Sequence, residues 1–219
     1  YKVVVAPLAY MVKPGFAERL TKFVENGGTL VGTYMTGLAD ETDRCIFGAY
    51  PGPLRNVFGL WVEETDALYP EETNQIIMNE NKEVYSCSFL CDRLRLENAK
   101  TLGTYGSDFY AGEPCVTVNE YGKGKAYYLG TQPDEAFLKM FVHKVCEEAD
   151  VHPVLQVEDG IEVTSRENEN GKFYFVMNHN AAEKQIVLPE GKWENLIVAQ
   201  PENGKLILKA RDVAVLKCQ

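Results

Sequence analysis

A chain of 219 residues with 45% hydrophobic residues is long enough to bury a core, as one large domain or as a medium and a small one. Its 22 Lys and Arg residues stand against 32 Asp and Glu residues, and the formal net charge of -10 disfavours nucleic acid and anionic membranes as partners. The first apolar run, Val3 to Ala9, is too short for a membrane span and lacks the features of a signal peptide, so a cytoplasmic protein is expected.

A strand, a helix and a second strand are predicted at the N-terminal end. Lys2 to Ala6 is a Val-rich run, typical of a strand buried on both faces. A helix is predicted between Pro14 and the Gly27-Gly28 stop, with apolar side chains at helical spacing: Phe16, Leu20, Phe23 and Val24. Thr29 to Tyr34 predicts a second buried strand. Together these elements indicate a right-handed βαβ unit and hence a parallel sheet.

A long loop is predicted from Met35 to Pro53, followed by a short helix from Pro53 to Phe58. The loop is rich in Gly, Asp and Pro, so it is expected on the surface, and its aromatic residues favour an ordered conformation. Its segment Asp40 to Arg44 alternates in charge, as solvated turns usually do. The loop is expected at the C-terminal edge of the parallel sheet, where α/β folds place sites or contacts.

Between Trp61 and Gly130 the pattern changes to short alternating strands. With Gly122-Lys123-Gly124 as the turn between the last two, the predicted strands are Gln75 to Met78, Val84 to Leu94, Thr101 to Tyr105, Cys115 to Tyr121 and Lys125 to Leu129. Asp134 is expected to cap a helix with this apolar face: Phe137, Met140, Phe141 and Val145.

His152-Pro153 is predicted to be a linker, because proline moves the preceding residue out of helical geometry. Beyond it the helical signal vanishes, and short strands alternate with turns such as Glu169-Asn170-Gly171 and Glu202-Asn203-Gly204. The predicted strands are Ile161 to Ser165, Lys172 to Met177, Lys184 to Leu188, Trp193 to Val198, Lys205 to Leu208 and Val213 to Lys217. The sequence therefore predicts an α/β domain over residues 1–152 and a small antiparallel β-sandwich over residues 153–219.

The chain offers little to catalysis. Asn119-Glu120 resembles the Asn-Glu of many barrel glycosidases, which need two carboxylates facing each other across the sugar. Glu120, however, is predicted at a hairpin turn, and a barrel typically needs about 250 residues. The loop after the first strand, Pro7 to Pro14, contains no glycine that could help to cradle a phosphate. No catalytic and no cofactor-binding residue is therefore assigned.

Six cysteines are scattered among predicted strands and helices, which is typical of reduced structural thiols: Cys45, Cys87, Cys91, Cys115, Cys146 and Cys218. Only Cys87 and Cys91 form a close pair, and no histidine lies at a spacing that would complete a zinc site with them; the histidines are His143, His152 and His179. No cysteine has the glycine-flanked elbow of a nucleophile. No metal ligand is assigned either.

Aromatic residues in or beside the predicted loops are the more useful sign, because large amphipathic side chains often anchor interfaces. The residues in question are Tyr34, Tyr50, Trp61, Tyr69, Phe109 and Tyr110. About half of them are expected to be core residues instead.

Several segments, in order, resemble one known family. They are Tyr1 to Pro7, Phe23 to Leu30, Asp40 to Arg44, Gly48 to Arg55, Tyr121 to Gly130 and Gly160 to Val163. They are similar to the middle and C-terminal domains of the β-galactosidases of glycoside hydrolase family 42, and the similarity spans essentially the whole chain.

The resemblance implies an N-terminal (β/α)8 barrel that carries both catalytic glutamates of a retaining hydrolase of terminal β-D-galactosides. It also implies a flavodoxin-like middle domain, related to class I glutamine amidotransferases, that forms a homotrimer, and a C-terminal antiparallel domain. This chain matches the second and third parts and is expected to begin inside the second. The family's catalytic glutamates and its cysteine-bound zinc belong to the barrel, so neither carries over to this chain.

The resemblance therefore predicts a non-catalytic assembly region. The loop from Asp40 to Pro53 and its aromatic residues are the candidates for contacts with other subunits or with the barrel. Two alternatives stay open: a stand-alone amidotransferase-like hydrolase, which would need a cysteine elbow, and a carbohydrate-binding module that uses a surface aromatic such as Trp193.

Overall fold

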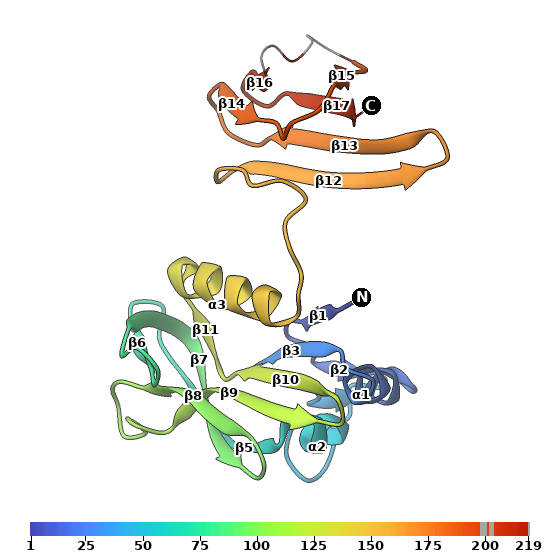
Figure 1. Cartoon of the computed structure of the whole chain (residues 1–219). Coiled ribbons are helices and arrows are strands. Elements are labelled where there is room, and N and C mark those ends of the chain that lie inside the picture. The colour runs from blue at the N-terminus through green and yellow to red at the C-terminus, as the bar shows by residue number, and fades with distance from the viewer. Residues whose placement is uncertain (198–200, 202–203, 219) are drawn as a thin grey trace. The chain divides into compact units, whose positions relative to one another are not determined.

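The computed structural model describes residues 1–197, 201 and 204–218, and divides into two compact units, Tyr1–Val151 and His152–Gln219 (Figure 1). Within the described residues the chain is mostly β, with few helices. None of the helices in that part of the chain is both long enough and apolar enough to cross a membrane.

The first unit is built on a mixed sheet whose strands follow the order β1-β3-β10-β9-β8-β6-β7-β11, with β5 paired to β7. The strands are β1 (Val3–Ala6), β3 (Thr29–Thr33), β5 (Leu60–Ala67), β6 (Asn74–Met78), β7 (Val84–Leu96), β8 (Lys100–Tyr105), β9 (Pro114–Tyr121), β10 (Gly124–Leu129) and β11 (Thr131–Pro133). The short strands β2 (Met11–Val12) and β4 (Ala39–Asp40) form a separate parallel pair.

The predicted βαβ unit is confirmed. Strands β1 and β10 both run parallel to β3, and α1 (Phe16–Glu25) connects β1 to β3. Helix α1 buries Ala17, Leu20 and Val24, which share one face at helical spacing. It ends where Gly28 N donates to the Phe23 carbonyl, a bond that satisfies one of the last free carbonyls of the helix.

The prediction that the first strand is buried on both faces is wrong. Val5 is 57% exposed, and the other β1 residues are only half-buried. The reason is that β1 is the outermost strand, with β3 on one side and no described strand on the other. Strand β3, which lies between β1 and β10, is the buried one of the pair.

The two faces of the mixed sheet carry separate cores. Successive β10 residues alternate between them, with Tyr127 in one cluster and Tyr128 in the other. Helix α3 (Glu135–Glu148), which Asp134 caps by accepting from Phe137 N, covers the first cluster. Helix α1 and the short η1 (Gly52–Leu54) and α2 (Arg55–Phe58) belong to the second.

The second unit contains two antiparallel sheets that share one core. Its strands are β12 (Ile161–Asn168), β13 (Gly171–Asn178), β14 (Lys184–Val187), β15 (Trp193–Asn195), β16 (Lys205–Leu208) and β17 (Val213–Cys218). Strand β17 lies between β13 and β15, while β14 pairs with β16. The predicted end of one strand at Val198 and the predicted turn at Glu202-Asn203 lie outside the described residues.

Packing of α3 on the sheet gives the first prediction. Phe141 is 2% exposed and stacks on Phe137 with ring centroids 5.5 Å apart, so Phe141→Ala should lower the free energy of unfolding by about 3–5 kcal/mol. Val142, the next residue, is 51% exposed, and Val142→Ala should change it by less than about 0.5 kcal/mol. Urea unfolding followed by circular dichroism measures both, and equal effects would contradict this packing.

Candidate functional site

The loop that precedes α2 is organised around one aspartate. Asp40 Oδ1 accepts hydrogen bonds from Thr42 N (2.9 Å) and Thr42 Oγ1 (2.7 Å), and its Oδ2 accepts from Arg44 Nε (3.0 Å). These bonds, chiefly the one from the Thr42 hydroxyl, lower the pKa of Asp40 to about 2. The charged segment is therefore a folded turn, because its side chains satisfy its own backbone.

The two ends of this loop meet backbone to backbone, and its tip faces solvent. A Cβ placed on Gly37 would lie 2.4 Å from the Pro51 carbonyl oxygen, and one on Gly52 would lie 2.7 Å from the Gly37 oxygen. Only glycine permits so close an approach. Between these two ends of the loop lies Phe47, which is 94% exposed. The loop thus presents a large apolar side chain to solvent while its ends are held together.

A buried carboxylate fastens the loop to the sheet. Asp92, on β7, is fully buried and accepts from Tyr50 Oη (2.6 Å) and Thr65 Oγ1 (2.8 Å) on one oxygen and from Tyr128 Oη (2.9 Å) on the other. The Tyr50 and Thr65 hydroxyls also contact each other. One side chain thus joins the loop, β5 and β10 to β7.

Burial decides the electrostatics of this cluster. It raises the pKa of Asp92 to about 6, although three hydroxyl donors favour the ionised form. Burial, together with the neighbouring Asp92 charge, raises the pKa of Tyr50 and of Tyr128. The tyrosines therefore stay protonated and act as hydrogen-bond donors.

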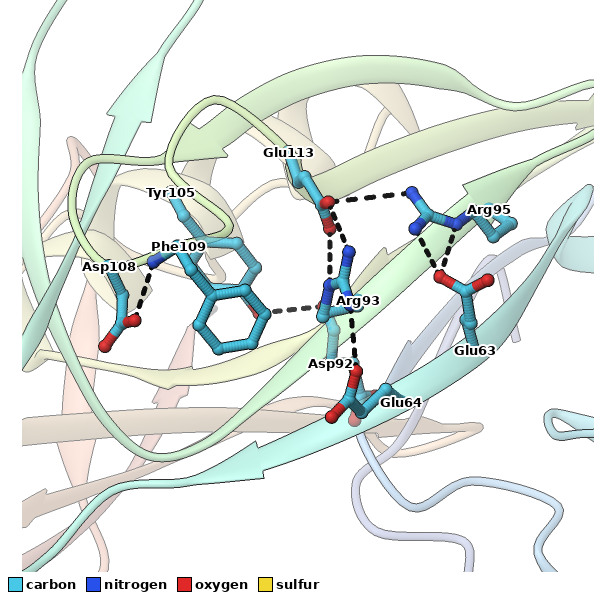
Figure 2. A network of polar contacts seen from close by, with 9 residues as sticks. All are labelled: Glu63, Glu64, Asp92, Arg93, Arg95, Tyr105, Asp108, Phe109 and Glu113. Carbon is cyan, nitrogen blue, oxygen red and sulfur yellow. Dashed lines mark hydrogen bonds and ion pairs between the residues drawn. The ribbon is translucent and has the colours of Figure 1, made fainter.

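The next residue, Arg93, leads a polar network outside this cluster (Figure 2). Its guanidinium donates to both oxygens of Glu113 (3.0 and 2.8 Å) and to Glu64 (2.8 Å). Arg95, on β7, donates from Nε (2.7 Å) and from Nη2 to a single oxygen of Glu63 on β5. Hydrogen bonds from Arg93 lower the pKa of Glu113, so this carboxylate stays ionised and is held in place.

This network supports a second exposed aromatic. The Arg93 guanidinium carbon lies 5.1 Å from the centre of the Phe109 ring, which is 68% exposed (Figure 2). The neighbouring Tyr110 is fully buried and donates from its hydroxyl to Asp66 (2.8 Å). The loop between β8 and β9 is thus fixed from both sides, and Phe109 is held facing solvent.

The aromatic residues singled out from the sequence divide as expected. Tyr34 and Tyr110 are buried and Tyr50 and Trp61 are half-buried, whereas Tyr69 and Phe109 are exposed. Phe47 and Phe89, which are 94% and 53% exposed, were not named from the sequence, although Phe47 is one of the aromatic residues of the Asp40 to Pro53 loop that were candidates for contacts. Their signal was available in part, since Phe47 lies inside the predicted surface loop.

The second unit's candidate aromatic, Trp193, packs inward. Its ring meets Tyr174 at 4.9 Å between centroids, and its Nε1 donates to the Pro189 carbonyl (2.8 Å). It is half-buried against the core of the second unit. This position does not favour a sugar-binding platform.

Glu120 and Asn119 have structural partners. The Glu120 carboxylate forms an ion pair with Lys100 (3.1 Å) in which both side chains are 71% exposed. Asn119 is buried and donates to the carbonyls of Asn56 (3.2 Å) and Val57 (2.9 Å), near the end of α2. Asn119 therefore holds the end of α2 against the sheet, and Glu120 is an exposed side chain near the turn of the β9–β10 hairpin.

None of the six cysteines lies on a glycine-flanked turn between a strand and a helix, the setting of a catalytic cysteine. Among the described residues no cysteine takes part in a disulfide; Cys87, Cys91 and Cys115 are buried on strands, Cys146 lies on α3, and Cys45 is exposed in the loop. Of the residues that the structure describes, no three His, Cys, Asp or Glu side chains are grouped so that they could hold a metal ion.

Two family models match the two units. The model described as "Beta-galactosidase trimerisation domain" matches residues 1–152, and the one described as "Beta-galactosidase C-terminal domain" matches residues 160–217. The two units thus match two domains described in glycoside hydrolases. The chain belongs to the β-galactosidases of glycoside hydrolase family 42, which confirms the resemblance drawn from its sequence motifs.

Individual relatives agree. The chain is 46% identical to the β-galactosidase BgaP of Planococcus sp. (strain L4) and 43% identical to BgaB of Geobacillus sp. (strain Y412MC61), in each case over 99% of this chain and 32% of the relative. A crystal structure of a β-galactosidase from Bacillus circulans sp. alkalophilus is similar over 100% of this chain and 33% of that one, with 42% identity and a TM-score of 0.93. The chain spans about a third of the length of these proteins.

The Asp92 cluster gives the second prediction. Asp92→Ala removes the acceptor of three hydroxyls and should lower the free energy of unfolding by about 1–3 kcal/mol or more. Asp92→Asn keeps an acceptor oxygen and the side-chain volume, so it should cost less. Hydrogen exchange should also show faster exchange in residues 40–53 of the alanine variant. An unchanged loop in that variant would show that Asp92 does not hold it.

The third prediction concerns pH. The ordinary pKa of 3.8 rises to about 6 for Asp92 in the folded chain, so on a rise in pH the unfolded chain ionises first. The contribution of Asp92 to the free energy of unfolding is therefore fully present below pH 3.8 and is lost as the pH rises to about 6, a change of about 3 kcal/mol. Asp92→Asn lacks this component, so the wild-type chain should lose stability relative to the variant across that window. Parallel profiles in urea unfolding would contradict the raised pKa.

Proposed function

We propose that this chain is the assembly and C-terminal region of a β-galactosidase that hydrolyses terminal β-D-galactosides, and that the chain itself performs no chemistry. The observation that carries the proposal is its match, over residues 1–152, to a domain named for trimerisation, together with its span of about a third of relatives named β-galactosidase.

Three carboxyl groups of the first unit support the proposal that this region does not catalyse glycoside hydrolysis. A glycosidase needs a general acid with a raised pKa beside a second carboxylate, both open to the sugar. Asp92 has a raised pKa but is fully buried beneath tyrosines. Glu113 has a lowered pKa because it is paired with Arg93, and Glu120 extends into solvent beside Lys100. In none of these cases is an acid both protonated near neutral pH and accessible.

The first unit is proposed to be a flavodoxin-like trimerisation domain over residues 1–152, with a C-terminal β-sandwich domain over residues 153–219. The parallel strands β1, β3 and β10 with the α1 connection support the first assignment, and the shared core of the two antiparallel sheets supports the second. The antiparallel strands β5 to β9 are additions to such a fold.

The partners are proposed to be two further copies of the same protein and its own catalytic (β/α)8 barrel. Phe47 and Phe109 are the proposed anchors, because each is a large exposed aromatic on a loop that buried or charge-paired groups hold rigid. A cytoplasmic location is part of the proposal, and six cysteines without a disulfide among the described residues support it, since disulfides are rare in that compartment.

Activity tests the first part of this proposal. The purified chain should leave a chromogenic β-galactoside unhydrolysed, whereas the complete protein should hydrolyse it. Glu120→Gln in the complete protein should leave kcat/KM unchanged, because the Glu120 side chain is 71% exposed and forms an ion pair with Lys100. Hydrolysis by the chain that Glu120→Gln abolishes would overturn the non-catalytic reading.

Assembly tests the second part. In the complete protein, Phe47→Ala and Phe109→Ala should each weaken the trimer by about 1–2 kcal/mol or more, seen as dissociation at higher protein concentration in sedimentation velocity. The matched control is Val84→Ala, which also removes an exposed apolar side chain of the first unit, 54% exposed, but one outside the two loops. Equal dissociation of all three variants and the wild type would remove Phe47 and Phe109 from the interface.

A further inference from the structure

Strand β7 contains a β-bulge that was not predicted from the sequence. Opposite it, the three residues of β11 pair in order: Pro133 with Cys87, Gln132 with Ser88, and Thr131 with Cys91. Two β7 residues, Phe89 and Leu90, therefore have no partner on β11. Phe89 has a φ of +70°, a conformation that places the extra residues outside the ladder.

The bulge brings two thiols together. Four positions apart on a regular strand, Cys87 and Cys91 would be about 13 Å apart. Because of the bulge, Cys87 and Cys91 lie opposite Pro133 and Thr131, which are only two positions apart on β11 and therefore on the same face. Two positions on a strand correspond to about 6.8 Å between Cα atoms. That spacing is at the upper end of the range that a disulfide spans, about 4.4–6.8 Å. Both side chains belong to the same buried cluster.

The chemistry of the pair is asymmetric. A hydrogen bond with the Cys87 thiol lowers the pKa of Cys91, while the same contact and burial raise the pKa of Cys87. The Cys91 sulfur also lies 3.7 Å from the Thr131 hydroxyl. Cys91 is thus the more readily ionised thiol of the pair, and Cys87 is the one that keeps its proton.

We propose that Cys87 and Cys91 are a dithiol modification site, which hydrogen peroxide converts into an intrachain disulfide across the bulge of β7. The Cys91 thiolate attacks a peroxide oxygen, the O–O bond breaks, and Cys91 becomes a sulfenic acid as hydroxide leaves and takes up a proton. The Cys87 sulfur then attacks the sulfenic sulfur, the S–O bond breaks, and water leaves. Overall two thiols are oxidised and one peroxide is reduced to two waters.

Access to the buried pair comes through the bulge. The extra residues contribute nothing to the β11 ladder, and Phe89 is 53% exposed. On the other edge Leu90 pairs with Ala67 of β5 and the Phe89 carbonyl accepts from Leu68 N, so the local opening that gives access to the sulfurs must also release these contacts. The third buried thiol of the cluster, Cys115, lies on β9, and burial raises its pKa well above the usual value. Cys115 is therefore not expected to compete.

The sequence makes the test direct, because trypsin releases both cysteines in one peptide, residues 83–93, between Lys82 and Arg93. The chain is treated with hydrogen peroxide, blocked with N-ethylmaleimide and digested without reductant. The expected mass spectrum shows this peptide with two hydrogens lost and no maleimide added. Reduction before blocking should restore two maleimides.

Two variants and one condition complete the experiment. Cys91→Ser should prevent the modification and leave Cys87 open to maleimide, whereas Cys115→Ala should leave the modification intact. Peroxide treatment in urea should abolish the preference for this pair, because it depends on the folded bulge. The proposal is overturned if both cysteines take up maleimide after peroxide has oxidised the exposed Cys45, or if Cys91 instead joins Cys115.

Discussion

One fully buried carboxylate, Asp92, connects three segments of the first unit that lie far from it in the sequence. Its oxygens accept hydrogen bonds from hydroxyl groups of the loop before α2, of β5 and of β10. The donors, Tyr50, Thr65 and Tyr128, lie 42, 27 and 36 residues from Asp92 along the chain. A buried carboxylate without such donors would be strongly unfavourable, so each donor stabilises the others' arrangement. The loop that carries Phe47 depends on it directly, because Tyr50 links that loop to the sheet.

Strand β7 links this hidden cluster to the surface. Its successive residues alternate between faces, so Asp92 meets tyrosines inside while Arg93 holds Glu64 and Glu113 outside and supports the ring of Phe109 (Figure 2). Rigid loops with exposed aromatic side chains suit contacts between proteins better than catalysis. In the proposed role the chain positions catalytic domains that belong to a longer polypeptide.

Much of this fold could be predicted from the sequence. The apolar spacing of α1 and the strand run of β3 gave the parallel unit, and the Gly122-Lys123-Gly124 turn gave the hairpin of β9 and β10. Strand β5 was missed because acidic residues interrupt its apolar pattern; they pair with arginines on β7. The Asp92 cluster and the bulge that joins Cys87 to Cys91 were missed as well, because both arise from pairing between distant segments.

The assembly role is tested most directly by the mass of the complete protein with and without this region. Native mass spectrometry should find the complete protein as a trimer and a version without residues 1–219 as a monomer, with the folded barrel verified by circular dichroism. A barrel that still forms the trimer after losing the Phe47 and Phe109 loops would contradict the account, because assembly would then reside elsewhere.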